Sequence, residues 1–194
     1  MEKELPQIIE KVKKEKGVLM YEDEASFQVT GTRTKGWLRR GRNEGREVES
    51  KPTRKSVKAY GAVSVSDKPA FHFLFVEKFN AHTFLRFLKR LAKRYSGRKV
   101  HLIADNAKYH DAEIVKLWLE KNSELIEVHF LPAYSPDFNA QEGVWRLTRR
   151  KSTHNRFFND EKELHQAIFR RFNRFQGNPA SLRNMIAPYY KMMA

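Results

Sequence analysis

The amino-acid sequence predicts an α/β fold, a mixed five-stranded sheet flanked by helices. Three runs of strand length follow one another in the first part of the chain, and two further strand-length runs then alternate with helical patterns. A meander of three strands followed by two right-handed crossovers gives a mixed sheet with helices on both faces. With 194 residues, 40% of them hydrophobic, the chain is long enough to bury the core of a single domain.

The composition narrows the classes of partner and site. The formal net charge of +15 at pH 7 favours a polyanionic partner, although a merely basic soluble protein is the alternative. The chain has no cysteine, and its seven histidines show no pair three or four residues apart, so we expect any bound metal to have oxygen ligands. There is no apolar run of 18 residues and no signal-peptide pattern, so we expect an intracellular protein with no membrane partner.

Residues 2–16 have the pattern of a short amphipathic helix, and residues 18–30 that of the first strand. Alternation along this strand places Asp23 on the face of four apolar side chains, namely Leu19, Tyr21, Ala25 and Phe27. A carboxylate among core-facing residues is costly unless it is paired or bound to a cation. Asp23 is therefore a functional candidate, with an exposed strand position as the alternative. Glu22 and Glu24, on the other face, are expected to face solvent.

Residues 31–56 predict a long basic loop or hairpin. Nine lysines and arginines stand there against three glutamates, with glycines that mark turns and Trp37 as the one aromatic anchor. A solvated charged face is the alternative, but the single sign of the excess charge favours contact with a DNA backbone. The candidate DNA-binding residues of this loop are Arg39, Arg40 and Arg42.

The middle of the chain predicts the rest of the sheet. Residues 57–65 and 70–76 read as a hairpin, residues 100–104 as a buried strand and residues 125–131 as a fifth strand. Asn80 caps the helix that follows the hairpin, and a second helix covers about 111–122. The apolar positions expected to face inward are Phe84, Leu85, Leu88 and Leu91 on the first helix and Ile114, Val115, Trp118 and Leu119 on the second.

Asp105 stands at the C-terminal end of the 100–104 strand, where ligands bind in open α/β sheets. The alternative is an aspartate that starts a turn or caps the helix near Asp111. We expect Asp105 to lie in the functional site because a second polar stretch, residues 131–145, also joins a strand end to a helix that opens with acids.

From about residue 137 the chain is helical and basic. Glu142, Trp145, Arg146 and Arg149 are spaced to share one helical face, so Glu142 can reach a metal while arginines contact phosphate. A helix-dipole effect or a surface Glu–Arg pair is the alternative for Glu142. The candidate DNA-binding residues here are Arg146, Arg149, Arg150 and Lys151. A final helix starts at Asp160, with Leu164, Ile168, Phe169, Phe172 and Phe175 expected to pack and Arg170, Arg171 and Arg174 expected to be exposed.

Asp23, Asp105 and Glu142 thus come from a first strand, a middle strand and a late helix. Three carboxylates that converge from separate elements suit two Mg²⁺ or Mn²⁺ ions, which prefer oxygen ligands and leave positions for water and phosphate. Two such ions, about 3.5–4 Å apart, promote in-line displacement at phosphorus.

Three stretches carry a resemblance to a known family. They read YEDEASF at residues 21–27, ADNAKYH at residues 104–110 and LPAYSPDFN at residues 131–139, the last followed by Glu142 and Trp145. In this order they closely resemble the DDE transposases of bacterial and archaeal insertion sequences in the Tc-mariner superfamily. The resemblance covers roughly residues 15–160.

The resemblance implies a ribonuclease-H-like fold with Asp23, Asp105 and Glu142 as the first, second and third catalytic acids, all three ligating metal. It implies hydrolysis of a phosphodiester at the ends of a transposon, followed by transfer of the freed 3′-hydroxyl into target DNA. The partners implied are double-stranded DNA and a second copy of the chain, in the nucleoid of the cytoplasm.

Two features depart from that family. Ala140 and Gln141 stand where the family usually has a proline and an aliphatic residue before the last acid. We also expect residues 1–194 to form one catalytic domain without the family's N-terminal helix-turn-helix domain, so that a separate polypeptide would recognise the transposon ends. Two other readings are open: a non-catalytic DNA-binding remnant or partner subunit of a split transposase, and a ribonuclease-H-like nuclease that acts on RNA–DNA hybrids or junctions.

Overall fold

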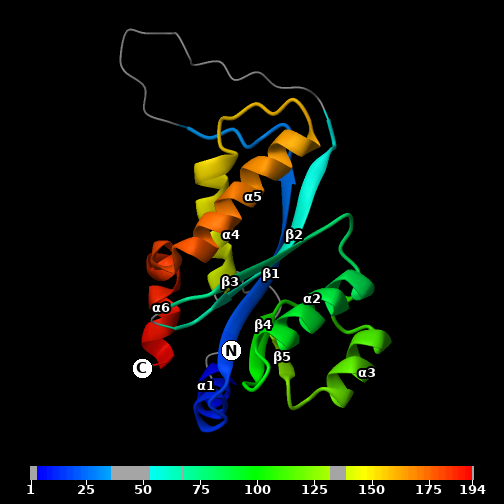
Figure 1. Ribbon diagram of the computed structural model, residues 1–194, viewed down its shortest axis with the longest axis vertical. Helices are drawn as coiled ribbons and strands as arrows, with labels where there is room; N and C mark the ends of the chain where they lie inside the picture. Colours follow the sequence, from blue (N-terminus) through cyan, green and yellow to red (C-terminus); the bar gives the residue numbers. More distant parts are fainter. Residues whose placement is uncertain (1–3, 36–52, 67, 132–138, 194) are drawn as a thin grey trace.

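The computed structural model describes residues 4–35, 53–66, 68–131 and 139–193. A five-stranded sheet lies at its centre (Figure 1). The elements, in chain order, are α1 (Glu4–Lys14), β1 (Val18–Gln28), β2 (Ser56–Ser64), β3 (Phe71–Val76), α2 (Ala81–Arg94), β4 (Val100–Ala104), α3 (Glu113–Lys121), β5 (Ile126–Phe130), α4 (Ala140–Ser152), α5 (Glu161–Gly177), the 3₁₀ helix η2 (Pro179–Leu182) and α6 (Arg183–Met193).

The strand order β3-β2-β1-β4-β5 confirms the predicted mixed sheet. The first three strands pair antiparallel, whereas β4 and β5 join parallel to β1 and to each other. The pairing of β1 with β4 ends at Tyr21 and Ile103, so β1 continues past the end of β4. Asp23 lies on this continuation, opposite Gly61 of β2.

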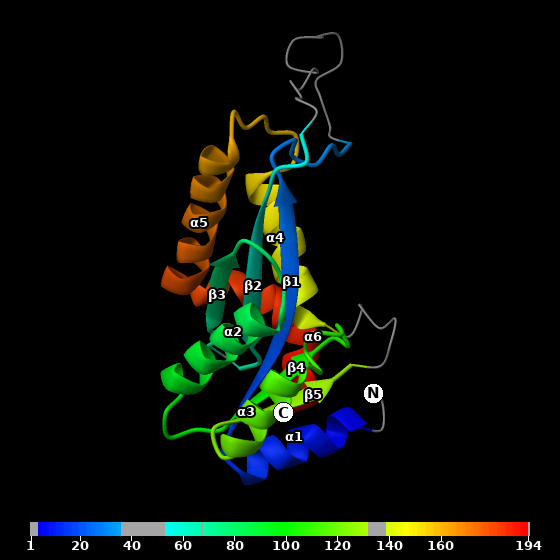
Figure 2. The ribbon, with the colours of Figure 1, turned by 90° about the vertical axis from the view of Figure 1, so that its right-hand side faces the viewer.

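Helices cover both faces of the sheet (Figures 1 and 2). One face packs against α2 and α3 through a cluster that includes Met20, Tyr60 and Phe84. The other face packs against α1, α4, α5 and α6, in a cluster that includes Trp145 and Phe172. The first five side chains of β1 are therefore buried, and only Ser26 and Gln28 toward its C-terminal end are exposed.

Gly61 lets α4 approach the sheet. A Cβ atom at this position would lie 2.4 Å from Cη2 of Trp145 and 2.6 Å from Nε2 of Gln141, well inside van der Waals contact. Trp145 is fully buried and meets Phe27 edge-on, with ring centroids 5.9 Å apart. The absence of a side chain at Gly61 therefore sets the height of α4 above β1, and with it the position of Glu142.

The expected helix caps and most of the expected core positions are present. Asn80 and Thr83 form a reciprocal capping box at the start of α2. Ile114 and Phe169, however, were predicted to pack inside and are 39% and 43% exposed. Ile114 lies in the first turn of the short helix α3, and Phe169 lies over the edge strand β3, 6.2 Å from the ring of Phe73. Beyond α5, η2 and α6 extend the chain where no element was predicted.

Among the described residues, no helix is both long and apolar enough to cross a membrane.

Candidate active site

Asp23 lies near the centre of β1, on the face that α4 covers. Burial, together with repulsion by Glu142, Glu24 and Asp105, raises the pKa of its carboxyl to about 8. Of these three charged neighbours, Glu142 raises the pKa of Asp23 the most. The structure thus brings Asp23 close to both of the other predicted acids.

Asp105 is the first residue after β4, and its side chain is half exposed. Its Oδ1 accepts a hydrogen bond of 2.9 Å from the Ala107 N–H, so Asp105 does start a turn, as the alternative interpretation expected. The same Oδ1 lies 3.2 Å from Nδ1 of His110. Hydrogen bonding to His110, and then to Ala107, holds the pKa of Asp105 below its usual value. The turn presents the carboxylate at the strand end, so the two interpretations are compatible.

Glu142 lies in the first turn of α4, which is anchored directly to β1. Asn139 caps this helix by accepting a hydrogen bond of 3.0 Å from the Gln141 N–H, and its side-chain amide donates 2.8 Å to the carbonyl of Glu22. One asparagine therefore fixes the start of α4 next to Asp23. Ala140 and Gln141, which depart from the family pattern, form the first two residues of α4 and are both buried.

The prediction that Glu22 and Glu24 face solvent is wrong. Glu22 is fully buried, and among the described residues its carboxylate oxygens have no hydrogen-bond partner. Burial, and then repulsion by Glu24, raises the pKa of Glu22 well above its usual range. Glu24 accepts hydrogen bonds from the Tyr109 hydroxyl and from Nε2 of His110. Glu22 and Glu24 do not face solvent because α2 and the segment after β4 cover this face of β1.

The carboxylates are close enough to share a cation. One oxygen from each of Asp23, Glu24 and Asp105 lies within 4.8 Å of the others. All of these donors are carboxylate oxygens, which suit hard cations such as Mg²⁺ and Mn²⁺. Their mutual repulsion also favours a bound cation. Glu24 is the member that the sequence did not nominate as a ligand, and its place beside Asp23 in the YEDEASF motif was the available signal.

A separate charged cluster lies at the other end of β4. His101 and His129, from neighbouring strands, approach to 3.2 Å between Nδ1 and Nε2. Glu127 beside them is paired with Lys11 at 2.7 Å and with Lys99 at 2.9 Å. We interpret this cluster as an ion-pair network that ties α1 to the sheet, because two ammonium groups already neutralise Glu127.

The predicted DNA-binding residues fall into three groups: those of the basic loop, three arginines of α4, and Lys151, which is described in the next paragraph. Arg39, Arg40 and Arg42 lie outside the described residues, as do Trp37 and most of the basic loop. On α4, Arg146, Arg149 and Arg150 lie within about 80° of Glu142 around the helix axis, and Arg146 and Arg150 are exposed.

Two other side chains of α4 turn away from this group. Trp145 is buried in the core rather than presented beside Glu142. Lys151 lies about half a turn from Glu142 and lines a different hollow of about 240 Å³. The other basic residues of that hollow are Arg156, Arg170, Arg171 and Arg174.

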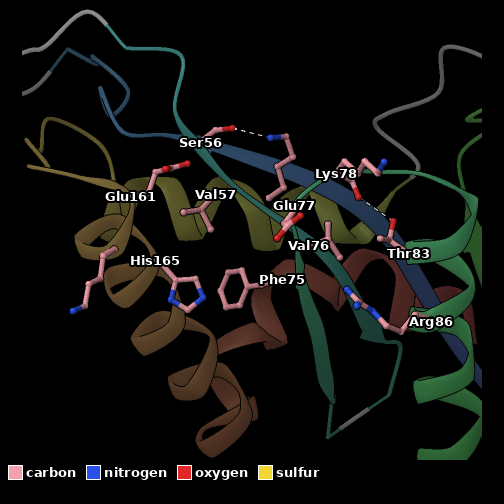
Figure 3. Close-up of a pocket in the computed structure, with 12 residues that line it drawn as sticks. Ser56, Val57, Phe75, Val76, Glu77, Lys78, Thr83, Arg86, Glu161 and His165 are labelled. Carbon is pink, nitrogen blue, oxygen red and sulfur yellow. Dashed lines mark hydrogen bonds between the residues drawn. The ribbon is translucent and has the colours of Figure 1, made fainter.

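A larger hollow of about 770 Å³ lies between β2, β3, α2 and α5 (Figure 3). Its lining mixes basic and acidic side chains, including Lys78, Arg86, Glu77 and Glu161, and the ring of His165 lies against Phe75. None of the three predicted acids lines it. This hollow is therefore distinct from the carboxylate site.

Comparisons with known proteins show the family and the fold of the chain. A family model described as "DDE superfamily endonuclease" matches residues 18–165. A search of curated proteins gave no match. Solved structures with a similar fold include the Mos1 transposase paired-end complex with left transposon end, at 17% identity and a TM-score of 0.57, over 98% of this chain and 62% of that one.

Two further Mos1 structures are similar. One is the Mos1 mariner paired end complex with Mn, at 18% identity and a TM-score of 0.53, over 96% of this chain and 60% of that one. The other is the catalytic domain of Mos1 mariner transposase, at 16% identity and a TM-score of 0.50, over 96% of this chain and 90% of that one. The chain thus spans about three fifths of the longer Mos1 chains. With the strand order, these similarities confirm the ribonuclease-H-like fold.

Proposed function

This chain belongs to the DDE superfamily endonuclease family, and we propose that it is the catalytic domain of a transposase. It would hydrolyse DNA phosphodiester bonds at transposon ends and transfer the freed 3′-hydroxyl into target DNA. The observation that carries this proposal is the convergence of Asp23, Asp105 and Glu142, which come from β1, the end of β4 and the start of α4.

The proposed cofactor is a pair of Mg²⁺ or Mn²⁺ ions, held by Asp23, Asp105 and Glu142. When bound, such ions activate the attacking oxygen and stabilise the leaving oxygen of an in-line displacement. The protein's own contribution is to hold the three carboxylates on rigid elements. Asn139 supports this by joining the start of α4 to the β1 backbone.

The proposed substrate is double-stranded DNA. Arg146 and Arg150 are exposed on the side of α4 that bears Glu142, so they are placed to contact phosphates that flank a bond in the site. The net charge of +15 supports binding of a polyanion. Phosphate contacts carry no sequence information, so we propose that a separate polypeptide recognises the transposon ends. We also propose a homodimer, because cutting two paired ends requires two catalytic sites.

The test is nicking of supercoiled plasmid at low salt with Mg²⁺ or Mn²⁺. We expect nicking by the wild type and by Glu113→Gln, an exposed acid on α3, and none by Asp105→Asn or Glu142→Gln. If all four proteins bind DNA equally and none cuts it, the chain is a DNA-binding protein without catalytic activity.

A further inference from the structure

One buried histidine next to the carboxylates has no part in the proposed function. His110 lies five residues after Asp105, and its side chain is completely buried. The imidazole packs against Phe84 of α2, with ring centroids 4.0 Å apart. Burying a polar ring against an aromatic core is unfavourable unless both of its nitrogens find partners.

Both ring nitrogens face acceptors in the candidate active site. Nδ1 lies 3.0 Å from the carbonyl oxygen of Asp105 and 3.2 Å from its carboxylate. Nε2 lies 2.9 Å from Oε1 of Glu24 on β1. A carbonyl and two carboxylates can only accept, so both nitrogens donate.

These bonds join two parts of the sheet that are not paired. The ladder between β1 and β4 ends at Tyr21 and Ile103, before Asp105 and Glu24 are reached. The Asp105 side chain is 51% exposed, so the surrounding core does not hold it in place. On the Glu24 side, the Tyr109 hydroxyl donates to the same oxygen as His110. The hydrogen bonds of His110 therefore join β1 to the end of β4 where the two strands share no backbone pairing.

We propose that His110 is a positioning residue: by holding Asp105 against Glu24 of β1, it sets the affinity of the carboxylate site for its divalent cation. This inference rests on the proposed function, since it concerns the same metal site. Partners that orient metal ligands typically contribute about 10–100-fold to metal affinity or activity. His110 would act on the ligand Asp105 and would not contact the cation itself.

The test is a titration of the full chain with Mn²⁺, which gives a dissociation constant by calorimetry or electron paramagnetic resonance without any DNA cleavage. We expect His110→Ala to bind Mn²⁺ about 10–100-fold more weakly, and we expect added imidazole to restore part of the affinity by filling the vacated space. His72→Ala is the matched control, because the His72 ring is partly buried and is hydrogen-bonded to Tyr95 at 2.9 Å, outside the carboxylate site. This control should bind Mn²⁺ as the wild type does.

Asp105→Asn separates this inference from the proposed function. If the wild type binds Mn²⁺, Asp105→Asn does not, and His110→Ala matches the wild type, the role of His110 is refuted while the metal site stands. If wild-type binding does not depend on Asp105, both proposals fail. If circular dichroism shows that His110→Ala is unfolded, the Mn²⁺ affinity of His110→Gln is measured instead. A glutamine amide cannot reach partners on opposite sides of the ring, so wild-type affinity in that variant would also refute the inference.

Discussion

A methyl group at Gly61 is the sharpest test of how the active site is assembled. The Cβ atom of Gly61→Ala would lie 2.4 Å from Cη2 of Trp145, whereas ordinary contact begins at 3.4 Å. The two groups must therefore separate by about 1 Å. Trp145 cannot yield by rotating, because Phe27, Phe71 and Phe172 all lie against its ring. We expect α4 to shift instead.

That shift has two measurable consequences. Overpacking of this kind costs about 1–3 kcal/mol of unfolding free energy, which urea denaturation will show. Because α4 carries Glu142, the shift also moves the third carboxylate away from Asp23 by about 1 Å. A displacement of that size can reduce the rate of an enzyme by about 100-fold, which the nicking assay will show if the proposed function holds.

Gly177→Ala is the matched control. Nothing lies within 4 Å of a Cβ built at Gly177, at the end of α5, so we expect stability and nicking activity like those of the wild type. If Gly61→Ala is as stable and as active as Gly177→Ala, the contact between Trp145 and β2 does not set the position of α4, and our account of the site is wrong.

Three further predictions concern the helix anchor, the ion-pair network and the DNA contacts. Asn139→Ala should lower the unfolding free energy by about 1–2 kcal/mol. Asn139→Ser, which keeps an oxygen for the cap but has no amide to donate to the Glu22 carbonyl, should lose less; equal losses would show that only the bond to β1 matters. Burial raises the pKa of Glu127, but the bonds from two lysines outweigh it and bring the pKa down to about 2. Glu127→Gln should therefore cost about 1 kcal/mol at pH 7, and melting curves should show the gap narrowing as the pH falls from 4.5 toward 2; a constant gap would exclude the ion pairs as its cause. Arg146→Gln should reduce the slope of log binding constant against log salt by about 0.9, and an unchanged slope would remove Arg146 from the DNA interface.

The local features of the fold were accessible from the sequence because they depend on short-range physics. Residues 100–104 form a strand because a short apolar run with β-branched residues suits a buried position. Asn80 starts α2 because its side chain and that of Thr83 satisfy free N–H groups at the helix start. A mixed sheet with helices on both faces followed from a meander and two right-handed crossover connections, a rule that needs no knowledge of individual contacts.

The three acids of the proposed site were nominated from the sequence, but their surroundings were not. Alternation along β1 assigns Asp23 and Glu24 to opposite faces, yet it does not show that their carboxylates approach each other at the edge of the site. Only the packing of α2 and the segment after β4 shows that Glu22 is buried and that Glu24 bonds to His110. These partners lie more than 80 residues from Glu24 along the chain, beyond the reach of any periodicity.

The sequence by itself therefore predicted the five strands, the helices as far as α5 and three candidate acids, because periodicity, capping and motif spacing are properties of neighbouring residues. The tertiary structure decided which side chains meet. It buried Trp145 over Gly61 and brought His101 against His129. Each of these outcomes depends on how closely two distant elements approach, and that distance is set by the volumes of all the side chains packed between them.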